Sequence, residues 1–384
     1  MNKLQNRKKR EIFWQGNARC FRQKERSDKV AEEALRQAAD AIIREARACG
    51  ASDIHISEGM QTRYRVHGRL VQAQTQYSAD ETAELLQSMM NEKQKKHFAN
   101  GNDADFAIRT SDGCRQRVNV FRQQKKIAAT IRLLNSTIPT LEDLKMPTIL
   151  YKMAMEPRGL ILVTGPTGSG KSTTLAAMIE HMNQNSDRHI ITIEDPIEYV
   201  YESKQSLIHQ REVGEDITDF ASAIRSALRE DPDVILVGEM RDYETISTAL
   251  LAAETGHLVL STLHTTGAAQ TVERIVDACP TGGQNQVRAQ LAGTLKGIVS
   301  QCLIPCGGGT ARVAATELLV GTDAILNLVR EGKAHQIPAM MQTGSSSDMH
   351  TLNMDLSRLV RQGFITRDDA IAYTNNKAEV GQYL

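Results

Sequence analysis

The chain lacks a net charge, a long apolar run and a sequence typical of a secretory signal. Its 384 residues include 46 Lys and Arg against 46 Asp and Glu, so the whole molecule has no overall field that would attract nucleic acid or anionic lipid. No apolar run approaches the ~20 residues of a membrane-spanning helix, and the basic N-terminus is not followed by an apolar segment. We therefore expect a cytoplasmic protein that meets a membrane only peripherally, through partners.

The cysteines are few and widely spaced, and no two are separated as C-x2-C. This spacing favours free thiols in a reducing compartment over a disulfide framework. The nearest pair is Cys302 and Cys306, and two thiols without a second pair make a poor zinc site. The cysteines therefore predict neither a disulfide-rich fold nor a structural metal.

The length allows two domains and a short additional segment. Residues 1–28 are basic with a few aromatic residues, and they predict a loosely ordered tail or an arm that touches an anionic surface or a neighbouring subunit. Residues 29–137 show helix and strand patterns typical of an α+β domain. Residues 138–146, which contain a proline, predict the linker.

Local patterns place the elements of this first domain. Helical spacing of apolar residues predicts helices over about 30–49 and 79–98. Alternation of polar and apolar residues predicts strands, with a turn at 67–70 after the second of them. The predicted strands are 52–56, 62–66, 106–108, 116–121 and 127–132.

Beyond the linker, residues 147–310 alternate strand and helix patterns, which predicts a parallel sheet flanked by helices and hence an α/β class. Residues 311–384 have an amphipathic helical pattern, broken by a small polar loop at 344–347. The core strands are predicted at 160–164, 189–193, 234–237 and 258–262.

Residues 165–173 read GPTGSGKST and are the most informative stretch of the chain. They follow an apolar strand pattern and precede a helical one, as in a P-loop; a glycine-rich turn without ligand fits that context less well. The glycines let backbone N–H groups face a polyphosphate, while Lys171 would reach the β- and γ-phosphates and the Ser172 hydroxyl would ligate Mg²⁺. The candidate binding residues for a nucleoside triphosphate are Gly165, Pro166, Thr167, Gly168, Ser169, Gly170, Lys171, Ser172 and Thr173.

Acidic residues follow two later strands, at the sheet edge where ligands of parallel sheets bind. Glu194, Asp195 and Glu198 follow one strand, and Glu239 follows the other as its lone carboxylate, after Gly238. We expect Glu239 to orient the attacking water, Glu194 and Glu198 to support phosphate geometry, and Asp195 to join Ser172 at Mg²⁺. The alternative for each group is a solvated strand end.

Three further residues are candidates with stronger alternatives. His264 follows the strand at 258–262 and could donate to a phosphate, although a lone histidine is more often structural. Arg225 and Arg229 share one helix face and could contact phosphate within the subunit or across an interface. Their alternative is a solvated helix face.

The motifs, taken in order, resemble those of the secretion ATPase superfamily. GPTGSGKSTT, TIEDPIEY, ALREDPDVILVGEMRD and TGHLVLSTLHTTGAAQTVERIVD are similar to its Walker A motif, Asp box, atypical Walker B motif and His box. ASDIHI and YRVHGRL resemble its N-terminal domain, and QLAGTLKGIVSQCL with LVREGKAHQIPAMMQTG resembles its C-terminal helices. The resemblance spans residues from about 30 to 375. It implies a PAS-like α+β domain followed by a RecA-like P-loop ATPase domain with C-terminal helices.

Within the superfamily, the chain is most similar to the PilT-like retraction ATPases of type IV pili. Assembly ATPases of the PilB or GspE kind carry a long N-terminal domain and a zinc-binding cysteine quartet, which do not occur here. The resemblance implies a ring-shaped homohexamer that hydrolyses ATP with Mg²⁺. It also implies work on an inner-membrane platform protein and the pilus machinery, from the cytoplasmic face of that membrane.

Three alternatives stay open at this point. Two use the same chemistry: an assembly ATPase, and a type IV secretion ATPase of the DotB kind. A RecA-like motor that translocates nucleic acid is the third, and the zero net charge argues against nucleic acid as a partner.

Two further sets of residues gain expected roles from the resemblance. Residues 324–331 resemble the retraction motif A-I-R-N-L-I-R-E, with Leu326 in place of its arginine, and Asn327, Arg330, Glu331 and Lys333 match its polar positions. This segment is expected to transmit force to the pilus machinery. In a ring, arginines of the N-terminal domain would face the adjacent subunit's nucleotide; the candidates are Arg117, Arg122 and Arg132.

Overall fold

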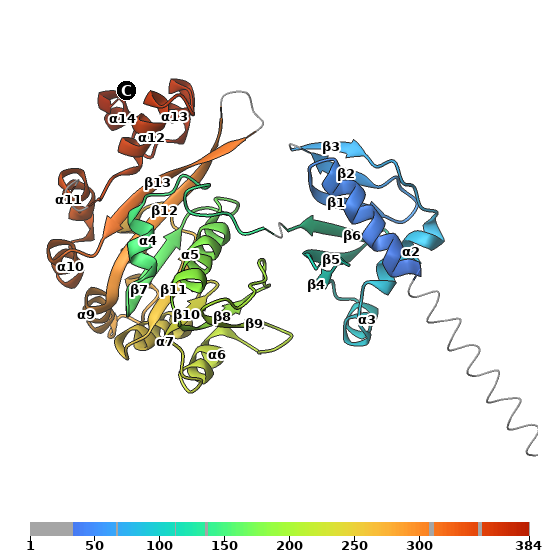
Figure 1. Cartoon of the computed structure of the whole chain (residues 1–384), viewed down its shortest axis with the longest axis horizontal. Helices are drawn as coiled ribbons and strands as arrows, with labels where there is room; N and C mark the ends of the chain where they lie inside the picture. Colours follow the sequence, from blue (N-terminus) through green and yellow to red (C-terminus); the bar gives the residue numbers. More distant parts are fainter. Residues whose placement is uncertain are drawn as a thin grey trace, which may run out of the picture. The chain divides into compact units, whose positions relative to one another are not determined.

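The computed structural model describes residues 34–66, 68–111, 113–134, 137–306, 311–344 and 348–383, so the basic arm at 1–28 lies outside the described residues. The chain divides into two compact units between Ser136 and Thr137 (Figure 1). In the described ranges, no helix is long and apolar enough to cross a membrane. The cysteines within these ranges are free thiols.

The first unit is an antiparallel sheet with helices packed on it. Its strands lie in the order β3-β2-β1-β6-β5-β4 (Figure 1). Alternate side chains such as Ile54, Val118 and Ile131 are fully buried against Ile42 and Leu86 of the helices. The elements are a helix at residues 34–48, β1 (Ala51–Ser57), β2 (Arg63–Val66), β3 (Arg69–Gln72), α2 (Ala79–Ser88), α3 (Glu92–Ala99), β4 (Ala104–Arg109), β5 (Arg115–Gln123) and β6 (Lys126–Leu133).

Two predictions for this unit are wrong. The single helix expected over 79–98 is two helices, because Asn91 begins α3 with a capping box that it shares with Gln94. The turn expected at 67–70 is shorter, since Arg69 and Leu70 already belong to β3 and pair with β2. Gly68 accommodates the tight reversal with a φ of 80°.

The second unit is an α/β sheet with the strand order β13-β12-β7-β11-β10-β8-β9 (Figure 1). Every neighbouring pair is parallel except β12 and β13. The parallel sheet is therefore confirmed, and its four predicted strands are β7, β8, β10 and β11. The strands are β7 (Gly159–Thr164), β8 (His189–Glu194), β9 (Leu207–Glu212), β10 (Val234–Val237), β11 (Leu258–Leu263), β12 (Leu295–Pro305) and β13 (Arg312–Val320).

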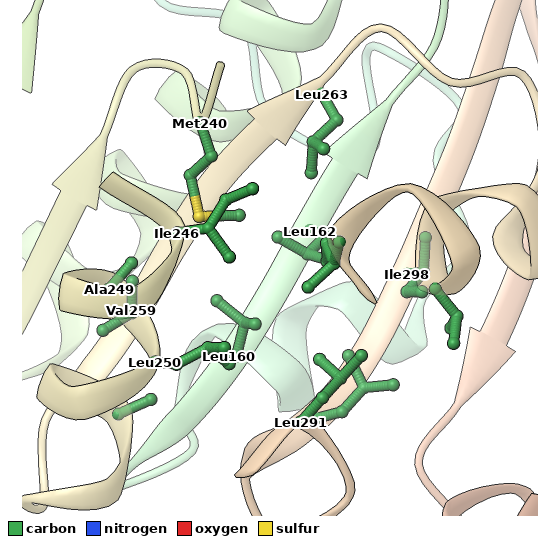
Figure 2. Close-up of a cluster of buried hydrophobic side chains, with 14 of the residues drawn as sticks. Leu160, Leu162, Met240, Ile246, Ala249, Leu250, Val259, Leu263, Leu291 and Ile298 are labelled. Atoms are coloured by element: carbon green, nitrogen blue, oxygen red, sulfur yellow. The ribbon is translucent and has the colours of Figure 1, made fainter. Parts of the chain in front are cut away.

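Helices cover both faces of this sheet. Ile161 and Val163 of β7 pack against α4 and α5, whereas Leu160 and Leu162 pack in the cluster that α7 and α9 form on the opposite face (Figure 2). Alternate residues of one strand thus serve two cores. The helices are α4 (Ile149–Ala154), α5 (Lys171–Asn185), α6 (Phe220–Ala227), α7 (Tyr243–Glu254), α8 (Ala268–Asp277), α9 (Gln284–Thr294), α10 (Asp323–Arg330), α11 (Ile337–Thr343), α12 (Leu352–Arg361), α13 (Arg367–Tyr373) and α14 (Lys377–Tyr383), with a short 3₁₀ helix at Ala334–Gln336.

The end of the sheet also corrects the sequence analysis. Residues 290–303 (QLAGTLKGIVSQCL), expected to be helical, form the end of α9 and then most of β12. Residues 312–320, also predicted to be helical, form β13. A Cβ on Gly297 would lie 2.9 Å from the backbone oxygen of Leu319, so glycine is needed where the two strands approach closely. Tertiary pairing here overrides the helical propensity of an Ala- and Leu-rich segment.

The double-sided core predicts the effect of truncating β7. Leu162→Ala should lower the free energy of unfolding by about 2–5 kcal/mol, because the side chain is 0% exposed and leaves a cavity. Leu207→Ala on β9, where the leucine is 50% exposed, should cost less than about 1 kcal/mol. Urea unfolding of both variants measures this difference, and equal midpoints would contradict the packing described.

Candidate functional site

The loop between β7 and α5 bends at three glycines. Gly165, Gly168 and Gly170 have φ values of 141°, 80° and 91°. A Cβ on Gly165 would overlap the backbone oxygen of Gln301, so only glycine fits there. Gly170 is the N-cap residue of α5, which leaves the free N–H groups of the first helical turn beside the loop.

The ammonium of Lys171 folds back over this loop. Its Nζ donates to the carbonyl oxygens of Gly165 at 2.9 Å and Pro166 at 3.2 Å. Burial lowers the pKa of Lys171, while the negative charges of Glu239 and Glu198 raise it. The structure therefore brings carboxylates from two other motifs within electrostatic reach of the P-loop lysine.

The outer part of the loop is open. Pro166, Thr167 and Gly168 are exposed, and so is Ser172 at the start of α5. Thr173 is partly buried, and its hydroxyl lies 3.1 Å from the Tyr199 hydroxyl. A ligand can therefore reach the hydroxyl of Ser172 and the loop backbone without moving the core.

A buried amide on β12 holds the inner part of the loop. Gln301 is 3% exposed; its Nε2 donates to the Ser169 carbonyl at 2.7 Å and its Oε1 accepts from the Thr174 hydroxyl at 2.9 Å. One side chain thus ties the loop to the first turn of α5. Gln301 belongs to no motif in the sequence, although an amide inside an apolar strand is the signal that could have identified it.

Glu194 ends β8 as a partly buried carboxyl. Its Oε1 accepts from the Thr192 hydroxyl at 2.6 Å and from the Gln210 amide at 3.2 Å. Burial raises the pKa of Glu194 to about 7, although these two hydrogen bonds lower it. The Glu194 carboxyl therefore keeps its proton to a higher pH than an exposed glutamate, and when protonated it can donate as well as accept.

Side chains of β9, a strand that was not predicted from the sequence, hydrogen-bond the backbone of the segment after β8. Asp195 is exposed and Glu198 is partly buried. The Glu212 carboxylate at the end of β9 accepts the backbone N–H of Ile197 at 3.0 Å, and Gln210 donates to the Tyr199 carbonyl at 2.8 Å. The sequence of β9 shows neither an apolar run nor clean alternation, so no pattern indicated it.

Glu239 and His264 meet at the ends of neighbouring strands. His264 Nε2 lies 3.0 Å from Glu239 Oε1, and Arg241 Nη2 lies 2.8 Å from Glu239 Oε2. The Glu239 side chain is 18% exposed, whereas His264 is 49% exposed. Because β11 lies between β7 and β10, His264 directly follows the strand that neighbours the P-loop strand.

The structure leaves Arg225 and Arg229 apart from this group. Arg225 pairs with Glu244 at 3.0 Å, and Arg229 donates to the Arg225 carbonyl at 2.8 Å. Within the described part of the chain, neither arginine has a hydrogen bond or ion pair to the P-loop. A role within the subunit has no support here, and a role across an interface stays a prediction.

The C-terminal motif covers α10 and the residues that directly follow it. Asn327 donates to Glu331 at 3.0 Å, Lys333 pairs with Glu331 at 2.7 Å, and Arg330 is exposed. Leu326 packs against the main hydrophobic cluster, so an apolar residue fits where the family motif has arginine. The three charged residues are close enough to form one surface.

The oxygen donors at this sheet edge suit Mg²⁺. The exposed Ser172 hydroxyl and the exposed Asp195 carboxylate are the ligand types that this cation takes. Among the residues that the structure describes, no three His, Cys, Asp or Glu side chains cluster as ligands. The donor set therefore fits a magnesium ion that keeps waters and takes further ligands from phosphates, as is usual for this cation.

Comparisons with known proteins show what the chain as a whole is similar to. The family model of type II/IV secretion system proteins matches residues 28–371. The chain is 51% identical over 307 residues to the twitching motility protein of Neisseria gonorrhoeae, covering 80% of this chain and 82% of that one. It is 49% identical over 322 residues to the type IV pilus retraction ATPase PilT of Pseudomonas aeruginosa, covering 84% and 93%. The crystal structure of the pilus retraction motor PilT with bound ADP matches with a TM-score of 0.83 and 47% identity, covering 89% and 98%.

The environment of Glu194 predicts a pH-dependent stability. The pKa of Glu194 is raised from 4.5 to about 7 in the folded state, so folding favours the protonated carboxyl. The stability that this protonation gives is fully present below pH 4.5 and is lost as the pH rises through about 7. Glu194→Gln should gain about 2 kcal/mol of unfolding free energy relative to wild type between pH ~5.5 and pH ~8.5.

Urea unfolding of both proteins at the two pH values measures this gain. The exposed Glu202→Gln on the same segment is the control and should show no pH-dependent difference. A constant difference between Glu194→Gln and wild type would contradict the burial of a neutral carboxyl.

Proposed function

The chain belongs to the type II/IV secretion system protein family, and we propose on that premise that it is a hexameric ATP-hydrolysing motor that powers type IV pilus retraction. The observation that carries the proposal is the convergence of the P-loop lysine with the Glu239–His264 pair at one sheet edge. The identity of about half to two proteins of pilus retraction and twitching motility supports the direction of the motor.

The loop residues define how ATP is held. The N–H groups of the glycine-rich loop and of the first turn of α5 bind the phosphates. Lys171 exchanges its two carbonyl partners for the β- and γ-phosphates, where its charge is needed. Ser172 and Asp195 would hold Mg²⁺, which neutralises phosphate charge during transfer.

Glu239 is the residue that orients the attacking water. Its carboxylate is fixed on both oxygens, by His264 and by Arg241, so the remaining lone pairs have a defined direction. Glu194 suits this role less, because its raised pKa leaves it partly protonated near pH 7. Glu194 and Glu198 instead support the geometry of the phosphates and of the cation.

The assembly is a homohexamer with ATP between subunits. The exposed outer loop leaves one side of the phosphates for a neighbour's arginines to approach. In its own unit, Arg117 pairs with Asp105 and Arg132 with Asp53, so each would exchange a carboxylate for a phosphate in the ring. Arg225 and Arg229 are further candidates at such an interface.

The motor works at the cytoplasmic face of the inner membrane, on a platform protein of the pilus machinery. The exposed charged surface of Asn327, Arg330, Glu331 and Lys333 is the segment that transmits force. Leu326, which is partly buried, packs against the core there, so this surface has one charge fewer than the family motif.

Glu239→Gln tests the catalytic assignment. The variant should bind ATP and assemble to a mass near six subunits by light scattering, because the P-loop is untouched. Its ATP turnover should fall about 10²–10³-fold, since the amide cannot accept the water's proton. Glu273→Gln, an exposed carboxylate on α8, is the matched control and should keep wild-type turnover.

Lys171→Ala completes the experiment and should abolish ATP binding. Near-normal ATP affinity in this variant would contradict the site. If Glu239→Gln stays within a few-fold of wild type while Glu198→Gln is inactive, the base belongs to the segment after β8.

A fully active monomer would refute the hexamer, and loss of pili rather than of retraction in a deletion strain would favour an assembly ATPase.

A further inference from the structure

Glu317 on β13 caps α8, the helix that follows residues 264–267, which we call the His264 loop. Its Oε1 accepts the backbone N–H of Ala268, the first residue of α8, at 2.8 Å. The N-cap residue Gly267 has no side chain to cap the helix itself. A Cβ at Gly267 would lie 3.3 Å from Glu317 Oε1, so the glycine leaves room for a cap supplied by a distant strand.

The second oxygen of the same carboxylate faces another helix. Oε2 lies 3.4 Å from the backbone N–H of Leu352, the first residue of α12. The neighbours of Glu317 on β13 also hold this region: Thr316 donates its N–H to Asp355 at 2.8 Å, and Leu318 pairs with His350. One carboxylate therefore bridges the starts of α8 and α12.

The two helix ends partly offset the charge of Glu317. In the described ranges no Lys, Arg or His forms an ion pair with it, and the positive ends of both helix dipoles point toward it. Burial raises the pKa of Glu317, while the two N–H bonds lower it. A partly buried carboxylate without a cation destabilises the folded state unless its hydrogen bonds compensate.

We propose that Glu317 is a positioning residue that ties the His264 loop to α12 and so passes changes at the nucleotide site to the C-terminal helices. Ala268 lies four residues after His264, which in turn contacts Glu239. A shift of His264 therefore moves the N–H that Glu317 accepts. The inference rests on the proposed ATPase function and deepens it by naming the link between hydrolysis and the C-terminal region.

The test compares Glu317→Ala and Glu317→Gln with Asp355→Asn in the full-length protein. Asp355 bonds Thr316 of β13 and Arg358 of α12, and within the described part of the chain it has no hydrogen bond to α8, so it is the matched control. ATP turnover gives kcat and KM. Hydrogen exchange of the first turn of α12, measured with and without ADP, gives the response to nucleotide.

We expect Glu317→Ala to lower kcat about tenfold with KM within about threefold, because His264 loses its support but the P-loop does not. Glu317→Gln keeps an acceptor for Ala268 and presents a donor to Leu352, so its kcat should stay within about twofold of wild type. Both variants should lose the ADP-dependent change in α12, and Asp355→Asn should keep it.

Wild-type kcat and a wild-type α12 response in Glu317→Ala would overturn the proposal. If Glu317→Ala does not fold, Glu317→Gln decides: a lost α12 response supports the link and a retained response contradicts it. A wild-type protein that does not hydrolyse ATP would instead refute the proposed function.

Discussion

The nucleotide site depends on one buried amide that is not part of any P-loop motif. Gln301 binds the loop through Ser169 and the helix through Thr174, and its own backbone oxygen occupies the space beside Gly165. The inside of the loop therefore packs against β12, and its outside stays open for ligand. Since Ser169 and Thr174 are themselves almost fully buried, losing the amide would leave polar atoms without partners inside the protein.

This arrangement makes β12 part of the framework that holds the P-loop. β12 lies beside β7 on one side and pairs with β13 on the other. Gln301 reaches the P-loop from β12, and Glu317 reaches the His264 loop from β13. The two strands thus contact both nucleotide-site loops and also hold the start of α12. In a motor, such a connection lets a structural change at the bound phosphates reach helices that lie far from them in the sequence.

The sequence predicted the parts of the fold that have strong local patterns. β7, β8, β10 and β11 were found because each is a short apolar run, and Lys171, Glu239 and His264 because they follow such runs in a motif order. β9 was missed since Leu207–Glu212 has mostly polar residues and depends on pairing with β8. β12 and β13 were missed because their composition suits a helix as well as a strand.

The sequence did not predict the roles of Gln301 and Glu317, and the physical reason is the same for both. Gln301 contacts Ser169 across 132 positions of sequence, and Glu317 contacts Ala268 across 49. No spacing rule relates residues so far apart, and a single Gln or Glu in an apolar strand does not reveal its partner. The structure was needed to show that these polar groups hold loops rather than bind ligand themselves.

The measurement that tests this account most directly is ADP binding to Gln301→Leu by titration calorimetry. The control is Gln290→Leu, the same chemical change at an amide of α9 that bonds Glu254 of α7. We predict that Gln301→Leu raises the ADP dissociation constant at least about tenfold, because the loop loses both anchors, while Gln290→Leu leaves it unchanged. Wild-type ADP affinity in a folded Gln301→Leu protein would show that the loop keeps its shape without the amide, and would contradict the account.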